Sequence, residues 1–253
     1  ITIALVGVDG AGKSTLRKEL AHWLSWKMDV HSYYLGSKQP SRASSLSYLL
    51  YRALRRSQRV VARALGEQTQ LSRWLAKARQ ASLYRHHIAV GKDRLQRYRA
   101  GVGKSAAGSI VIFDRFPLSA IPGANAAYHL DGPQIKRLAQ ESGDQNATSA
   151  IHCEDRIYAE IQAPDAVMLL MVSPQVSLQR KPDHRKEAIE QKYQTLHDLA
   201  AQTEGRMGNA RNISREETDP GGTLNSPRIL TINAERELEA VIQQLKGEIW
   251  KLL

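Results

Sequence analysis

The chain of 253 residues contains one cysteine, Cys153, so no disulfide can form within it. We therefore expect a reducing compartment, and the cytoplasm is the natural one. Long apolar runs are also missing. The longest, residues 166–172, has the length of a strand and is far too short for a membrane-spanning helix. The sequence thus predicts no transmembrane segment.

Acidic residues are scarce between residues 36 and 104. This segment contains 16 lysines and arginines but only Glu67 and Asp93 as acids, so its net charge is +14, whereas the whole chain carries +11. Such a segment implies an anionic partner, which can be a phosphorylated substrate, a nucleic acid or an anionic membrane surface. A basic helical face that is simply solvated explains the charge equally well.

The most informative stretch is Gly7-Val-Asp-Gly-Ala-Gly-Lys-Ser14, which fits the phosphate-binding pattern G-x-x-x-x-G-K-[ST] in full. It follows a strand-like run at 1–6 and precedes a helical pattern at 15–26. In this arrangement backbone N–H groups and the helix N-terminus face phosphate oxygens, Lys13 reaches the β- and γ-phosphates, and Ser14 binds Mg²⁺. The residues predicted to hold ATP in this loop are Gly7, Gly10, Ala11, Gly12, Lys13, Ser14 and Thr15.

Strand-like and helical segments alternate along the chain, which predicts an α/β fold with a mostly parallel central sheet and helices on both faces, as in P-loop NTPases. The expected strands are 1–6, 30–35, 110–113, 167–172 and 228–232. The expected helices are 45–65 (ended by Gly66), 70 into the nineties, 153–162, 174–179, 186–201 and 238–252.

Irregular structure is expected at 117–133 and 204–227, with a flexible connection through Gly101, Gly103 and Gly108. We interpret residues 1–253 as one P-loop domain with a basic helical insertion at about 37–104. The chain opens on Ile1 directly at a strand and without Met, so we expect residues to be missing before it.

A second signal is Asp114-Arg115, which directly follows the buried strand predicted at 110–113. An acid at the carboxyl tip of a strand lies at the edge where α/β sheets bind ligands. Asp114 is suited to hold Mg²⁺ or its waters, and Arg115 to clamp a phosphate. A purely structural Asp–Arg pair is the alternative. The phosphate-binding loop in the same chain favours the functional interpretation, and the lack of an Asn-Lys-x-Asp segment argues against a GTPase.

With these pieces the chain resembles the thymidylate kinases and their nucleoside-monophosphate-kinase-like relatives. The matching pieces are Gly7-Val-Asp-Gly-Ala-Gly-Lys-Ser-Thr15, Asp114-Arg-Phe116, the segment 164–180 and Ile229-Leu-Thr-Ile-Asn-Ala234. They occur in the family's order, but residues 36–104 and 204–227 are not accounted for. The resemblance implies an enzyme that transfers a phosphoryl group from Mg²⁺·ATP to a nucleoside monophosphate, and it implies a homodimer.

The resemblance also implies roles for single residues. Asp9 resembles the acid that faces the acceptor sugar or the metal, and Arg85 the arginine that projects toward the acceptor base. Asp114 and Arg115 would lie between the acceptor phosphate and Mg²⁺·ATP. Beside the adenine would lie Asn233 and Ala234.

In the same way the resemblance implies a lid at about 179–187. Gly10 stands where some members of the family carry a catalytic arginine, and in the resembling subgroup a lid over ATP supplies that charge. Arg180 and Arg185 are the candidates, because mobile guanidinium groups can stabilise the charge on the moving phosphoryl group. The Leu35-Gly36-Ser37 segment lacks the Glu-Pro-Gly of typical thymidylate kinases, which leaves the acceptor open.

Three alternatives remain at this level. The acceptor can be an unphosphorylated nucleoside or another small molecule, with Asp9 or Asp114 orienting its hydroxyl group. The protein can instead be a P-loop ATPase that docks on nucleic acid or a membrane through residues 36–104. The third alternative is a degenerate binding protein. The intact Lys13, Ser14 and Asp114 argue against it.

Overall fold

A computed structural model describes residues 1–122, 124, 131–210 and 227–253. The chain forms two units, each with its own contacts. Unit 1 comprises Ile1–Gly36, Arg97–Gly132 and Gln162–Leu253, and unit 2 comprises Ser37–Gln96 and Pro133–Ile161. Unit 2 thus contains most of the basic segment together with a second stretch of chain. The interpretation as one domain with an insertion stays a prediction.

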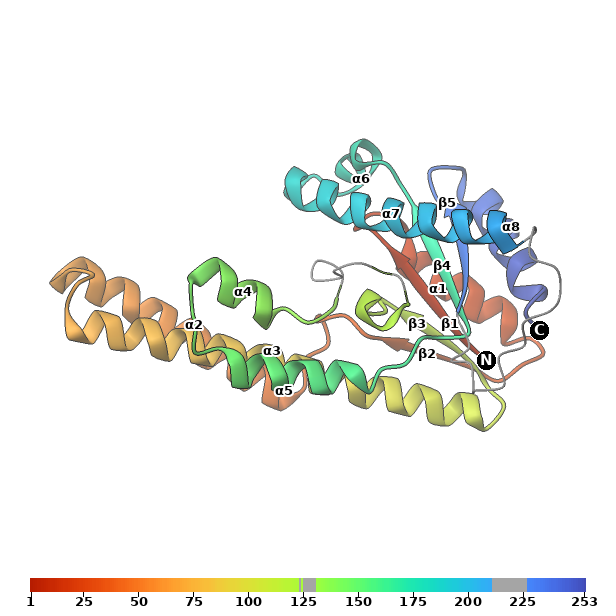
Figure 1. Cartoon of the computed structure of the whole chain (residues 1–253). Coiled ribbons are helices and arrows are strands. Elements are labelled where there is room, and N and C mark those ends of the chain that lie inside the picture. The colour runs from red at the N-terminus through yellow and green to blue at the C-terminus, as the bar shows by residue number, and fades with distance from the viewer. Residues whose placement is uncertain (123, 125–130, 211–226) are drawn as a thin grey trace. The chain divides into compact units, whose positions relative to one another are not determined.

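Unit 1 is built on a parallel sheet in which the strands lie in the order β2-β3-β1-β4-β5 (Figure 1). This confirms the expected α/β class and the parallel sheet. The strands are β1 (Thr2–Gly7), β2 (Val30–Tyr34), β3 (Ile110–Asp114), β4 (Ala166–Met171) and β5 (Arg228–Asn233).

Burial along the central strands shows that both faces of the sheet are covered. Successive side chains of a strand point to opposite faces, yet Ala4 and Leu5 are both fully buried. The same holds along β3 and β4, whose sequences are continuous apolar runs. The helices of unit 1 are α1 (Lys13–Leu24), α6 (Pro174–Arg180), α7 (Lys186–Ala210) and α8 (Leu238–Trp250), with a 3₁₀ turn, η1 (Leu118–Ala120).

The register of the sheet brings the phosphate-binding loop at 7–14 and the Asp114-Arg115 pair to one edge. In the β1–β3 pair Leu5 stands opposite Asp114, so the loop after β1 starts beside the carboxyl end of β3. Parallel strands end at the same edge, which is where ligands bind in folds of this class.

Unit 2 is helical and has a small core. Its elements are α2 (Arg42–Leu65), α3 (Gln70–Ala106) as far as Gln96, α4 (Ile135–Ser142) and α5 (Thr148–Ala159). The buried residues at the centre of one cluster are Tyr84, Ile135, Ala139 and Ala147. Within the described residues, no helix of either unit is both long and apolar enough to cross a membrane.

Two buried acids fasten the helices of unit 2. Asp93 on α3 accepts hydrogen bonds from the Ser44 hydroxyl (2.6 Å) and the Ser41 backbone N–H (2.9 Å), which fixes the start of α2. Glu154 on α5 accepts from the N–H groups of Gln134 and Ile135, so it satisfies the N-terminus of α4 from another helix.

Several expected boundaries were wrong. The region of Gly101 and Gly103 is not a flexible connection, because α3 continues through it to Ala106. The helix expected at 153–162 covers 148–159, and α4 was not expected. Helix α7 extends to residue 210, so 204–210 is not irregular, and residues 211–226 lie outside the described part. As expected, α2 ends at Gly66, whose φ of 86° is left-handed.

The physical reason for Gly101 is close packing. A Cβ atom at this position would lie 2.7 Å from the ring of Phe113 on β3, so only glycine lets this turn of α3 approach the strand. A Cβ atom at Gly103, one half-turn away, would meet nothing within 4 Å. The two glycines therefore have different roles in one helix.

This difference predicts opposite effects of the same substitution. Gly101→Ala is expected to lower the free energy of unfolding by about 1–3 kcal/mol through overpacking. Gly103→Ala is expected to raise it by about 0.5–1 kcal/mol, because alanine loses less backbone entropy in a helix. Urea denaturation of both variants measures this; equal effects of the two would contradict the packing argument.

Candidate functional site

The loop after β1 has the backbone that the glycine pattern requires. Gly10 (φ 88°) and Gly12 (φ 79°) are both left-handed, and Gly12 is the N-cap residue of α1. At Gly7 a Cβ atom would lie 2.8 Å from the carbonyl oxygen of Leu170 on β4. The loop is therefore pressed against the sheet, and α1 begins directly after it.

Lys13 is buried under this loop and bonds to it. Its Nζ donates to the backbone oxygens of Gly7 (2.8 Å) and Val8 (2.6 Å). Burial, and after it the charge of Arg115, lowers the pKa of Lys13 from 10.5 to about 8. A bound anion at this place would therefore offset the free-energy cost of burying the Lys13 ammonium group.

Ser14 and Asp114 meet at the start of α1. The Ser14 hydroxyl donates to Asp114 Oδ2 at 3.3 Å, and Arg17 Nε lies 3.7 Å from the same oxygen. Asp114 is only 1% exposed, and its Oδ1 has no hydrogen-bond partner in the described structure. A hydroxyl and an orphaned carboxylate oxygen side by side fit a hard cation such as Mg²⁺.

Protein side chains alone do not build a complete metal site here. The described residues contain no cluster of three or more His, Cys, Asp and Glu side chains that would hold an ion. A Mg²⁺ ion at Ser14 and Asp114 needs further oxygen ligands, and phosphate groups on the adjacent loop are one source of them.

Asp9 is the centre of an ion-pair cluster at the same edge. Its carboxylate accepts hydrogen bonds from Arg115 (2.6 Å, from the end of β3) and Lys192 (2.7 Å, from α7), and His184 Nδ1 lies 3.8 Å away. Burial raises the pKa of Asp9, but the bonds from Lys192 and Arg115 outweigh it and hold the pKa well below its usual range. Asp9 is therefore ionised at every physiological pH.

Arg115 is held in an unusual backbone conformation. Its φ of 64° is left-handed, as is that of Asp131 (60°), whose carboxylate lies 3.7 Å from the Arg115 guanidinium. Burial lowers the pKa of Arg115, yet Asp131 and Asp9 raise it above its ordinary value. Left-handed non-glycine residues cost of order 1–3 kcal/mol each and gather at functional sites.

A cavity of about 240 Å³ lies between the loop and the start of α8. Arg180, at the end of α6, closes one side by donating to the backbone oxygens of Gly10 (3.2 Å) and Ala234 (3.1 Å). The cavity is lined by Gly10, Ala11, Gly12, Thr15, Leu16, Arg180, Ala234, Arg236, Leu238 and Val241. It combines an apolar floor with two arginines at the rim.

The structure brings most of the predicted residues to this edge. Those that meet there are Asp9, Lys13, Ser14, Asp114, Arg115, Arg180 and Ala234. Asn233 does not line the cavity; its Oδ1 accepts from the Glu235 backbone N–H. Arg185 is exposed between α6 and α7, and Arg85 belongs to unit 2.

Four residues of the site were not predicted as single site residues, although His184 lies in the segment expected to form the lid: Asp131, His184, Lys192 and Arg236. The role of Lys192 could have been predicted from the spacing of its helix. It lies between Ile189 and Leu196 at helical spacing, and both of these are buried. A lysine within the apolar stripe of a helix calls for a buried partner, here Asp9.

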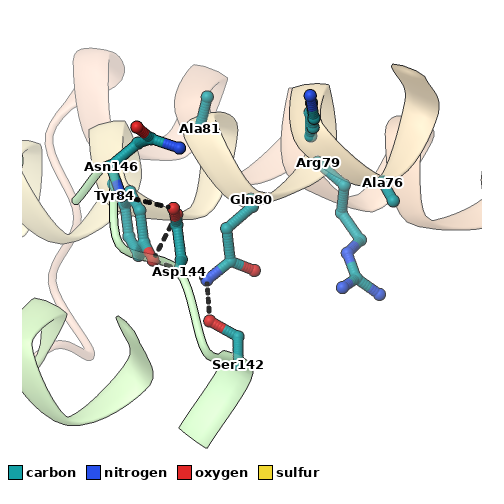
Figure 2. A pocket seen from close by; sticks show the side chains of 9 residues that line it. Ala76, Arg79, Gln80, Ala81, Tyr84, Ser142, Asp144 and Asn146 are labelled. Atoms are coloured by element: carbon teal, nitrogen blue, oxygen red, sulfur yellow. Dashed lines mark hydrogen bonds between the residues drawn. The ribbon is translucent and has the colours of Figure 1, made fainter. Parts of the chain in front are cut away.

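Unit 2 has a cavity of its own, about 430 Å³, which Figure 2 shows. The Tyr84 hydroxyl donates to Asp144 (3.0 Å) and accepts from Gln80 (2.8 Å), and Gln80 also donates to Ser142 (3.2 Å). These bonds tie α3 to the end of α4 and to the chain that follows it. The side chains of Gln80, Tyr84, Ser142 and Asp144 thus bond to one another, which is a structural role.

No protein-family model matches the chain. Two uncharacterized ATP-binding proteins of Escherichia coli K12 are similar to it: YghS is 26% identical over 193 residues (75% of this chain, 77% of YghS), and YghR is 26% identical over 197 residues (75% and 72%).

Among solved structures, deoxyadenosine kinase from M. mycoides superposes over 99% of this chain and 100% of its own. Its complex with dCTP gives a TM-score of 0.52 at 14% identity, and its complex with dCMP and dCDP gives 0.50 at 15%. At such identity the likeness establishes the fold alone.

The ion pairs of Asp9 predict that the contribution of this residue to the free energy of unfolding depends on pH. Because the pKa of Asp9 is lowered by folding, its ionised form stabilises the folded state. That contribution is complete above the pKa of an unfolded aspartate, about 4, and fades as the pH falls through the lower pKa of the folded protein. Asp9→Asn should therefore lower the free energy of unfolding by about 2–3 kcal/mol at pH 7.

Urea denaturation between pH 2 and 7 measures this difference. The gap between the wild type and Asp9→Asn is expected to shrink as the pH falls below about 4. Asp183→Asn, at an exposed aspartate in the nearby 181–185 segment, is the control and should change little. A gap that stays constant with pH would show that Asp9 does not act through its charge.

Proposed function

We propose that the protein transfers the γ-phosphoryl group of ATP, with Mg²⁺, to a nucleoside monophosphate. The observation that carries the proposal is the position of Asp9. Its carboxylate accepts hydrogen bonds from Arg115 and Lys192, and it lies at the same edge of the sheet as the loop that bonds to Lys13. The names of the ATP-binding relatives and the kinase activity of the structural neighbour support it. A cytoplasmic location and a homodimer stay predictions.

At the donor end, the loop amides and α1 receive the triphosphate. Lys13 exchanges the carbonyl oxygens of Gly7 and Val8 for β- and γ-phosphate oxygens, which compensates the buried ammonium better than neutral groups do. Ser14 and Asp114 would hold the Mg²⁺ ion, and Asp114 Oδ1, which has no hydrogen-bond partner among the described residues, is available to it. An ion bound there would neutralise phosphate charge.

The adenosine part of ATP occupies the cavity beside the loop. Arg180 and Arg236 lie at its rim, and Leu238 and Val241 provide an apolar surface for the base. Ala234 lines this cavity, and Asn233 helps to shape the turn before α8 through its bond to Glu235. The Arg180 guanidinium donates to the Gly10 carbonyl oxygen of the loop, so it lies close enough to reach the phosphates.

At the acceptor end, Arg115 and Lys192 meet the acceptor phosphate. Both are already paired with Asp9, so an incoming phosphate competes with a carboxylate for them, and His184 adds a third positive group when protonated. Arg185 approaches when the 179–187 lid closes. Transfer then depends on positioning and charge neutralisation.

A nucleoside is the second candidate acceptor, and one feature favours it. Asp9 is ionised and buried, so it can accept a hydrogen bond from a sugar hydroxyl and orient it toward the γ-phosphate. Asp114 is the other carboxylate at this edge. The structural neighbour, a deoxyadenosine kinase, acts on acceptors of this class.

The test is a panel of acceptors. ADP release from Mg²⁺·ATP is measured with each nucleoside and nucleoside monophosphate in turn, with single-stranded DNA as a further sample, and products are identified by mass spectrometry. One monophosphate converted to its diphosphate supports the proposal, and a nucleoside converted to its monophosphate supports the second candidate. A response to DNA alone would overturn both.

Lys13→Ala is expected to abolish this turnover, with a loss of at least about 1000-fold in kcat, because the donor phosphates lose their buried cation. Circular dichroism controls for folding. Retention of most of the turnover would contradict the assignment of the loop as the donor site.

Lys192→Met separates the acceptor end from the donor end. The side chain keeps its approximate length but loses its charge, so KM for the acceptor should rise about 10-fold or more while KM for ATP changes little. Lys18→Met, at an exposed lysine of α1 outside the lid, is the control. A rise in KM for ATP alone would place Lys192 at the donor end.

A further inference from the structure

Helix α2 has a composition that its burial does not explain. Its 24 residues include Arg42, Arg52, Arg55, Arg56, Arg59 and Arg63 but no acid. Ser44 is its one buried residue. A helix of this length that rests on its neighbour through so little surface leaves most of its side chains facing outward.

The outward side of α2 is apolar. Residues at alternating spacings of four and three form one row along it: Leu46, Leu50, Ala53, Ser57, Val60 and Ala64. All six are exposed, with 69% of Leu46 and 59% of Val60 accessible. The contacts to α3 come from another side of the helix, where Ser44 and Ser47 bond to Asp93 and His86.

Arginines line the flank of this row. At 100° per residue, Arg52, Arg56, Arg59 and Arg63 fall together on one side of the apolar row. The start of α3 continues the pattern within unit 2, because Leu71 (47%) and Trp74 (62%) are exposed beside Arg73 and Lys77. Figure 1 shows α2 and the first part of α3 running alongside each other.

Charge and polarity together select the kind of partner. A second copy of this chain would bring one set of arginines against another, with no acid on α2 to compensate. Nucleic acid suits the arginines but leaves the leucines and valine without a role, since such interfaces are polar and strongly charged. An apolar row flanked by arginines, with a tryptophan near its end, is the pattern of helices that lie in the surface of anionic membranes.

We propose that the outward face of α2 and the start of α3 bind the surface of an anionic lipid membrane, with the leucines and Val60 inserted among the acyl chains and the arginines on lipid phosphates. This goes beyond the proposed reaction and does not depend on it. The arginines of α2, which contribute to the net charge of +14 between residues 36 and 104, then serve membrane attachment.

The test uses the full chain and vesicles. Flotation is measured with vesicles of phosphatidylcholine alone and with an equimolar mixture of phosphatidylcholine and phosphatidylglycerol. We expect binding to the mixture that weakens as salt is added, and little binding to phosphatidylcholine. Brominated lipids in the mixture are expected to quench tryptophan fluorescence, and Trp74→Ser should remove most of this quenching.

Variants with matched controls test the face itself. Replacing Arg52, Arg56 and Arg59 by Gln should reduce the partition coefficient roughly 100-fold, since each basic residue near the surface contributes about fivefold. Leu46→Ser with Val60→Ser should reduce it at least 10-fold at unchanged charge. The controls are Lys18→Gln, Lys27→Gln and Lys251→Gln together, which remove the same charge from unit 1, and Trp26→Ser, at a tryptophan that is 82% exposed.

The outcomes separate the alternatives. Binding lost in the α2 variants but kept in the controls supports the proposal. Equal loss in the lysine control would reduce it to general attraction by net charge and overturn it. So would binding of single-stranded DNA with no binding of vesicles, or a dimer, detected by analytical ultracentrifugation, that the Leu46→Ser and Val60→Ser changes dissociate.

Discussion

The buried carboxylate of Asp9 is the interaction on which the arrangement of the sheet edge depends. It joins three segments that are far apart in the chain: the loop after β1, the end of β3 through Arg115, and α7 through Lys192. Burial of an unpaired carboxylate is strongly unfavourable, because the charge loses its hydration without gaining a partner. The two cations therefore keep α7 and the strained Arg115 in place beside the loop that holds Lys13.

The same physics explains what the sequence could and could not reveal. The loop at 7–14 and the strand before Asp114 were predictable because their patterns are local: glycines at fixed spacing, and apolar runs that end in an acid. Lys192 and His184 were missed because their role comes from a partner more than 170 residues away. Gly101 was misinterpreted as a flexible point because its neighbour, the ring of Phe113, belongs to another element.

The two units also differ in whether their apolar surfaces are covered. In unit 1 the apolar runs of the central strands are covered on both faces, and Asp9 at the sheet edge is paired with Arg115 and Lys192. On α2 the helical periodicity was correctly predicted, but periodicity does not tell what covers an apolar stripe. The stripe proves to be exposed, and the surplus of arginine beside it has no acid on the same helix.

We propose that the loop at 7–15 and the Asp9 cluster are the donor and acceptor ends of one reaction site. The most direct measurement is a crystal structure with Mg²⁺ and a bisubstrate analogue in which adenosine and a nucleoside are joined by a chain of phosphates. We expect the phosphates on the loop amides and Lys13, the adenosine between Arg180 and Val241, and the nucleoside end at Arg115 and Lys192. Electron density for the nucleoside end away from both residues, with the Asp9 ion pairs intact, would contradict it.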